Sequence, residues 1–173
     1  MDKSNSESYK TVDAPSTFSE NHYRLAADFS VKRSQIKFVA NNEAMRSAAR
    51  AEDVDSGDTS NVSADILGRQ IQRDDIPGGP DFIIILRADV SKGDGISAYR
   101  RLVGKELNPP LDLNSEDNTS LFYAFLLLHE IGHHRKKHYG DDKYDIKEFE
   151  ADAWALEQLR PRLREFLPKT WTP

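Results

Sequence analysis

Apolar residues recur along this chain at two spacings, one typical of helices and the other typical of strands. Helical spacing predicts main helices at residues 19–32, 41–51, 93–107, 121–138 and 145–159, with a short one that begins near Pro161. Runs of β-type residues predict strands at 35–40, 66–72 and 82–86. A turn rich in proline and glycine separates the last two strands, so we expect them to form an antiparallel hairpin. The pattern therefore predicts an α+β domain with a short antiparallel or mixed sheet.

The helix expected at 121–138 differs from the others because it is apolar on nearly all sides through Leu128. A helix of this kind is expected to be buried in the middle of the fold. The polar segment 114–120 before it offers capping and acidic residues, which suit the positive end of a helix. Basic residues at 135–137 suit the negative end, and Gly140 is expected to cap it. We therefore give the basic triplet a structural role, not one in binding nucleic acid.

The composition is that of an ordinary globular domain. The chain has 173 residues, 24 of them basic and 29 acidic, with a net charge of −5 and no cysteine. Neither nucleic acid nor a membrane surface is an expected partner, and no apolar run is long enough to span a bilayer. We expect residues 1–18, which are polar, to form a flexible tail and residues 19–173 to form one domain. The polar N-terminus lacks a secretion signal, which predicts a soluble cytoplasmic protein.

The central helix carries the pattern His-Glu-x-x-His, at His129, Glu130 and His133. Residues four apart lie on one face of a helix, so both imidazoles can reach one metal ion while Glu130 stands beside them. This spacing is typical of zinc hydrolases. A metzincin would continue with glycine and histidine where this chain has Lys136 and Tyr139, so that class is not expected.

A catalytic zinc site needs a third protein ligand, and the next helix offers one. Glu148 and Asp152 are four residues apart, so both can face the histidine helix. We expect Glu148 to bind zinc and Asp152 to accept the free ring N–H of a ligating histidine. Two alternatives stay open. Glu148 could instead form a capping box with Asp145, and Asp142 is a second candidate for the third ligand.

The same residues predict a mechanism in which zinc lowers the pKa of its bound water to about 7 and Glu130 is the general base. An extended peptide substrate is expected to add as a strand to an exposed sheet edge, near 82–86. The transition state also needs a hydrogen-bond donor. The candidates are Tyr139, Tyr144, His134 and His138.

The segment from 120 to 161 resembles the ImmA/IrrE family of small intracellular zinc metallopeptidases, which belong to the gluzincins. The matching positions after the His-Glu-x-x-His pattern are Glu148, Ala151, Asp152, Trp154, Ala155, Leu159 and Pro161. The resemblance implies a zincin-like fold, Zn²⁺ as cofactor, Glu148 as third ligand and Glu130 as base. It also implies a protein substrate such as a transcriptional repressor. The chain departs from the family in Trp154, where phenylalanine is usual, and in the short gap between His133 and Glu148.

Two other kinds of function remain open. The chain could be a non-catalytic zinc-binding regulatory protein on a peptidase scaffold, although a structural site has no need of Glu130 between its ligands. It could also be a hydrolase that acts on bonds other than peptide bonds.

Overall fold

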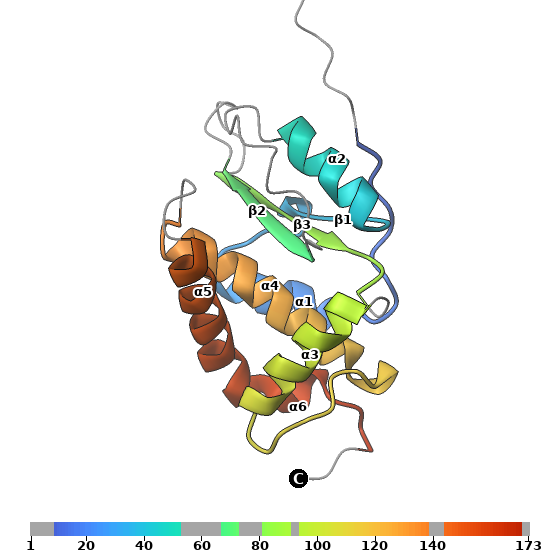
Figure 1. Ribbon diagram of the computed structural model, residues 1–173, viewed down its shortest axis with the longest axis vertical. Helices are drawn as coiled ribbons and strands as arrows, with labels where there is room; N and C mark the ends of the chain where they lie inside the picture. Colours follow the sequence, from blue (N-terminus) through green and yellow to red (C-terminus); the bar gives the residue numbers. More distant parts are fainter. Residues whose placement is uncertain (1–8, 53–66, 73–80, 91–93, 139–143, 171–173) are drawn as a thin grey trace, which may run out of the picture.

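A computed structural model describes residues 9–52, 67–72, 81–90, 94–138 and 144–170 (Figure 1). The main helices are α1 (Glu20–Asp28), α2 (Asn42–Glu52), α3 (Asp94–Glu106), α4 (Thr119–Arg135), α5 (Tyr144–Leu159) and the short α6 (Leu163–Phe166). The strands are β1 (Ile36–Val39), β2 (Gly68–Gln72) and β3 (Phe82–Arg87). Short 3₁₀ turns lie at Arg33–Gln35, Glu116–Asn118 and Arg160–Arg162. The prediction of an α+β domain with a small sheet is confirmed.

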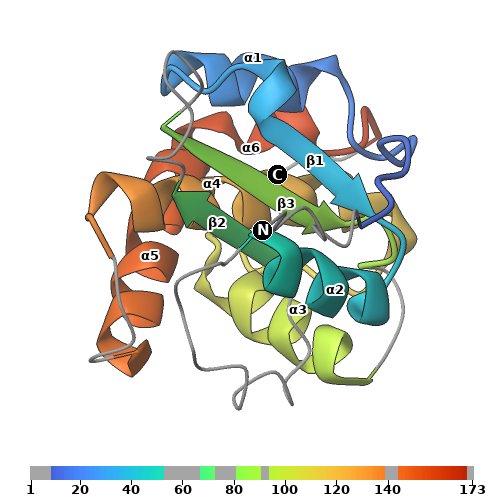
Figure 2. The same cartoon turned by 90° about the horizontal axis from the view of Figure 1, so that it is seen from above.

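The strands form one mixed sheet in the order β1-β3-β2 (Figure 2). β3 runs parallel to β1 and antiparallel to β2, so the predicted hairpin of β2 and β3 is confirmed. Ile84, for example, lies opposite Ile36 on one side and Gln70 on the other. The prediction that 82–86 forms an exposed edge is wrong, because β3 has a hydrogen-bonded neighbour on each side. Among the described strands, β1 and β2 form the two edges, and β1 also has an isolated bridge to Val12.

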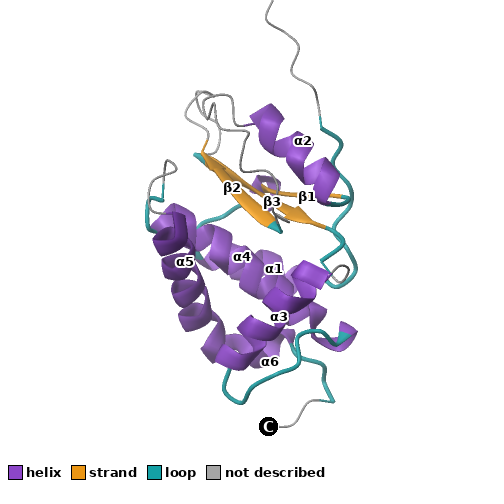
Figure 3. Ribbon diagram, in the orientation of Figure 1, coloured by secondary structure: helices purple, strands orange, loops and turns teal. Residues whose placement is uncertain are grey.

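The sheet lies between α2 on one face and α4 with α1 on the other (Figures 1 and 3). Successive side chains of a strand point to opposite faces, so β3 serves two apolar clusters. Ile83 and Ile85 pack with Met45 on the α2 side, whereas Ile84 and Leu86 belong to the main core around α4. All six residues of β3 are buried, which explains why the strand is apolar without alternation from Phe82 to Leu86.

Helix α4 occupies the centre of the main core, as its apolar sequence predicts. Every residue from Leu121 to Leu128 is at most 2 % exposed. In the part of the chain that the structure describes, no helix is long and apolar enough to cross a membrane. The His-Glu-x-x-His segment therefore lies near the C-terminal end of a helix that packs against α5, α1 and the sheet.

The predicted tail at 1–18 extends too far along the chain. Val12 forms a β-bridge with Phe38, and Phe18 is only 4 % exposed. Both residues therefore belong to the folded part. The Phe18 ring is buried in the core, although the residues around it in the sequence are mostly polar. Residues 1–8 lie outside the described part.

Two helices end earlier than the sequence pattern predicts. α1 ends at Asp28, since Ser30 has a backbone φ of 65° and cannot continue a right-handed helix. α4 ends at Arg135, and Lys137 has a φ of 55°. The left-handed residue that closes α4 is therefore Lys137 and not Gly140, which lies outside the described residues.

Candidate metal centre

His129 and His133 lie one turn apart on α4, and their Nε2 atoms are 3.0 Å apart. Glu148, on α5, places one carboxylate oxygen 3.3 Å from His129 Nε2 and the other 3.2 Å from His133 Nε2. These three side chains form a group that could hold a metal ion. Because both oxygens of Glu148 face the imidazoles, its carboxylate does not fold back toward Asp145 as the capping-box alternative requires.

Close packing of α4 against α5 brings the three side chains together. A side chain on Gly132 would meet the Trp154 ring at 3.2 Å and the carbonyl oxygen of Ala151 at 3.3 Å. The helices can therefore approach closely because Gly132 has no side chain and Ala151 has a small one. This contact lies next to His133 and three residues after Glu148, so it fixes how far the carboxylate stands from the imidazoles.

The donor atoms are of the kinds that bind zinc, and the two imidazole nitrogens have the spacing of ligands to one ion. Tetrahedral zinc with bonds of about 2.0–2.1 Å separates its ligand atoms by about 3.3 Å. The two Nε2 atoms are 3.0 Å apart, which is close to this edge length, and each has a different oxygen of Glu148 at 3.2 or 3.3 Å. Two imidazole nitrogens and one carboxylate are also a ligand set that zinc uses in catalytic sites, where a fourth position stays open.

The ring nitrogen of His129 that does not face Glu148 is held by a second carboxylate. Asp152 Oδ1 lies 2.8 Å from His129 Nδ1, and the Tyr99 hydroxyl donates to the same oxygen at 2.7 Å. Burial, together with the nearby charge of Asp152, raises the pKa of Tyr99, so this hydroxyl stays protonated and donates. The role of Asp152 agrees with its spacing from Glu148, whereas nothing in the sequence of α3 marks Tyr99 as a partner of α5.

The carboxylates around the two histidines favour positive charge at this place. Burial by itself lowers the pKa of His129, but hydrogen bonds to Asp152 and Glu148 and the charge of Glu130 raise it to about 10. Burial raises the pKa of Glu148, but the two histidines outweigh it and hold that pKa at about 2. An environment that stabilises a proton between these groups also suits a divalent cation.

Glu130 is buried between α4 and β2, with 4 % of its surface exposed. The backbone N–H of Gln70 donates to its carboxylate, and a side chain on Gly68 would lie 2.6 Å from its Oε1. Burial raises the pKa of Glu130, although the two histidines of the site act in the opposite direction. A raised pKa suits a group that must accept a proton near neutral pH. No pattern in the sequence indicates this contact between Glu130 and β2.

The four predicted transition-state donors have different positions. His138 lies behind His133, with the Nδ1 atoms of the two rings 3.1 Å apart, so it does not face the Nε2 atoms of the candidate ligands. The His134 ring stacks on Phe82 at 3.7 Å between centroids, and burial lowers its pKa. Tyr139 lies outside the described residues, as does the side chain of Tyr144 at the start of α5. Asp142, the alternative third ligand, lies outside them as well.

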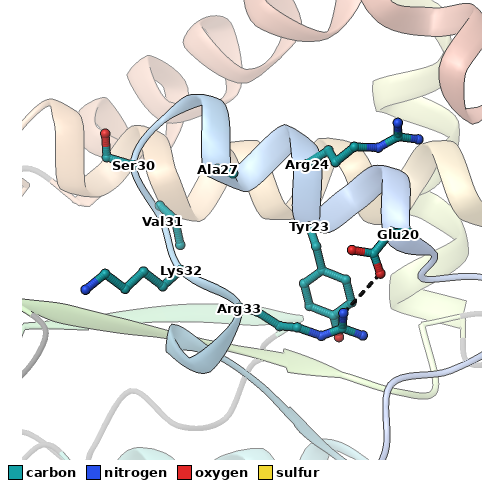
Figure 4. Close-up of a pocket in the computed structure, with 8 residues that line it drawn as sticks. All are labelled: Glu20, Tyr23, Arg24, Ala27, Ser30, Val31, Lys32 and Arg33. Carbon is teal, nitrogen blue, oxygen red and sulfur yellow. Dashed lines mark hydrogen bonds and ion pairs between the residues drawn. The ribbon is translucent and has the colours of Figure 1, made fainter.

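A surface pocket of about 460 Å³ lies between α1 and the segment that leads to β1 (Figure 4). Its lining is Glu20, Tyr23, Arg24, Ala27, Ser30, Val31, Lys32 and Arg33. Arg33 pairs with Glu20 at 3.0 Å and lies 3.9 Å above the Tyr23 ring. None of the lining residues belongs to the metal centre, so the pocket is separate from it.

Comparison of the chain with protein-family models, with curated proteins and with solved structures gave no match. The resemblance of 120–161 to the ImmA/IrrE family therefore stays a prediction from its motifs. The geometry of the candidate centre stands independently of that resemblance.

Proposed function

We propose that this protein is a zinc-dependent metallopeptidase. The observation that carries the proposal is that the side chains of His129, His133 and Glu148 come together as a group that could hold a metal ion. Glu130 lies beside the two histidines on α4. A purely structural metal site has no use for a buried carboxylate at this position. The resemblance to the ImmA/IrrE family supports the same proposal.

The chain supplies each group that peptide hydrolysis needs. His129, His133 and Glu148 would hold the zinc, which when bound would act as a Lewis acid toward water and the scissile carbonyl. Glu130 takes the proton from the attacking water and later delivers it to the leaving amine. Asp152 keeps the His129 ring oriented by accepting its Nδ1–H at 2.8 Å.

The substrate is proposed to bind as an extended peptide along β2. This strand is at the edge of the sheet among the described strands, and its Gln70 N–H points toward Glu130. An edge strand offers backbone donors and acceptors to an added peptide, next to the residue that acts as base. By the family resemblance, the peptide belongs to a cytoplasmic protein such as a transcriptional repressor.

The proposal is tested by measuring zinc content and peptide cleavage in the wild type and in Glu130→Gln. A peptide library is incubated with each zinc-loaded protein, and new peptide ends are identified by mass spectrometry. Loss of the general base is expected to slow cleavage by about 10²–10⁴-fold while zinc content stays at one ion per chain. Glu157→Gln, the same change at an exposed position of α5, is the matched control and is expected to cleave normally.

Equal cleavage by Glu130→Gln and wild type would show that the mechanism is wrong. If both proteins bind zinc and neither cleaves any peptide, the result favours a non-catalytic zinc-binding protein instead.

A further inference from the structure

We infer that His138 is a positioning residue for the metal centre, which holds the His133 ring in place and is itself held by Glu150. The inference rests on the proposed zinc site. It assigns a role to two residues outside the ligand set, one after the end of α4 and one on α5.

The backbone at the end of α4 brings His138 back toward His133. The Lys137 N–H donates to the His134 carbonyl at 3.1 Å, and the His138 N–H donates to the His133 carbonyl at 3.0 Å. With Lys137 in the left-handed region at a φ of 55°, this is a Schellman motif. The motif commonly places the side chain of its last residue against the residue five positions earlier. Here those two residues are His138 and His133.

The side chains then form a chain of hydrogen bonds that leads away from the metal centre. His133 Nδ1 lies 3.1 Å from His138 Nδ1, and His138 Nε2 lies 2.8 Å from Glu150 Oε2. The His138 side chain is only 5 % exposed, whereas that of Glu150 is 50 % exposed. The series of hydrogen bonds therefore leads from His133, a candidate ligand, through the buried His138 ring to the Glu150 carboxylate at the surface.

Hydrogen-bonding capacity decides which ring nitrogens carry protons. The carboxylate of Glu150 can only accept, so Nε2 of His138 must carry a hydrogen. A neutral His138 then has a bare Nδ1, which accepts the Nδ1–H of His133. A neutral His133 in turn has a bare Nε2, and this is the atom that faces His129 and Glu148. These hydrogen bonds thus select the tautomer of His133 that can bind a metal.

The two candidate histidine ligands are therefore oriented by different means. His129 reaches Asp152 directly, because Asp152 lies one turn after Glu148 on α5. Glu150 lies two residues after Glu148, on a different side of the helix, so it does not share the direction of that carboxylate. The His138 ring bridges the remaining distance between Glu150 and His133.

The test is the zinc affinity of the full chain, measured by competition with a chromophoric chelator. His138→Phe keeps a ring but removes the acceptor, and its affinity for zinc is expected to fall by about 10–100-fold. His138→Gln keeps an acceptor and a donor and is expected to recover most of the affinity. Lys137→Gly preserves the left-handed turn and is the matched control, with wild-type affinity expected. The visible spectrum of bound Co²⁺ is expected to change in His138→Phe and to stay close to wild type in His138→Gln.

Wild-type affinity in His138→Phe would overturn the inference while leaving the proposed peptidase intact. An equal loss in the Phe and Gln variants would also overturn it, because packing and not hydrogen bonding would then be responsible. If His138→Phe fails to fold, Glu150→Ala decides, since unchanged zinc affinity in that variant contradicts the chain of hydrogen bonds. A wild-type protein that binds no zinc overturns both this inference and the proposed function.

Discussion

Replacing Gly68 with alanine is expected to remove peptidase activity without removing zinc. The new Cβ would stand 2.6 Å from Glu130 Oε1, whereas ordinary contact begins at 3.4 Å, so the carboxylate must shift by about 3.4 − 2.6 = 0.8 Å. A displacement of about 1 Å in a reacting group costs roughly 10²-fold in rate. This corresponds to about 2.7 kcal/mol in the free energy of activation, at about 1.36 kcal/mol for each factor of ten. We therefore expect kcat/KM to fall by roughly 10²-fold.

The assay compares kcat/KM on a peptide that the wild type cleaves with the zinc content of the same preparations. Zinc content is expected to stay the same, because Glu130 is not among the candidate ligands. Gln70→Ala, two residues along β2, is the matched control because it keeps the backbone N–H that donates to Glu130. The new Cβ also lies 3.0 Å from Leu86, so thermal unfolding is measured to confirm that Gly68→Ala is folded at the assay temperature.

Activity of the folded Gly68→Ala protein within threefold of wild type would contradict this prediction. Such a result would mean that the activity does not depend on the position of the Glu130 carboxylate beside β2. A general base must keep its position, so Glu130 would then not be the base.

Two further predictions concern the third ligand and the effect of pH on stability. Glu148→Ala is expected to lose zinc binding as measured by metal content after dialysis, whereas Asp142→Ala is expected to keep it; the opposite result would make Asp142 the ligand. The His22 ring is buried, with Nδ1 accepting from the Ser19 N–H and Nε2 bonded to the Ser120 carbonyl, and burial lowers its pKa below the ordinary value of 6.5. Above pH 6.5 the His22 ring is neutral in both the folded and the unfolded state, so its contribution to stability is complete there. As the pH falls from 6.5 toward the lower pKa of the folded state, the unfolded state binds a proton first. The contribution is then lost at up to about 1.4 kcal/mol per pH unit. Denaturant unfolding between pH 7 and pH 5 is expected to show a smaller loss of stability in His22→Gln than in wild type, and equal losses would contradict this role.

Several features of the protein follow from local patterns in its sequence. The apolar run from Leu121 predicts a buried central helix, because a helix without a polar face has no side to turn toward water. The paired runs at 66–72 and 82–86 predict the hairpin of β2 and β3. The spacing of the His-Glu-x-x-His pattern places His129, Glu130 and His133 along one turn, and helical geometry alone requires this.

Which of the distant residues meet depends on the tertiary structure. It placed both oxygens of Glu148 against the two histidines, which spacing had left open to a capping role. It brought Tyr99 to Asp152 and Gly68 to Glu130, and it put β3 and not β2 in the middle of the sheet. These contacts join elements that are far apart in the chain, and their partners are chosen by how whole helices and strands pack. A local pattern shows which face of a helix or strand is apolar, but it does not predict which other element packs against that face.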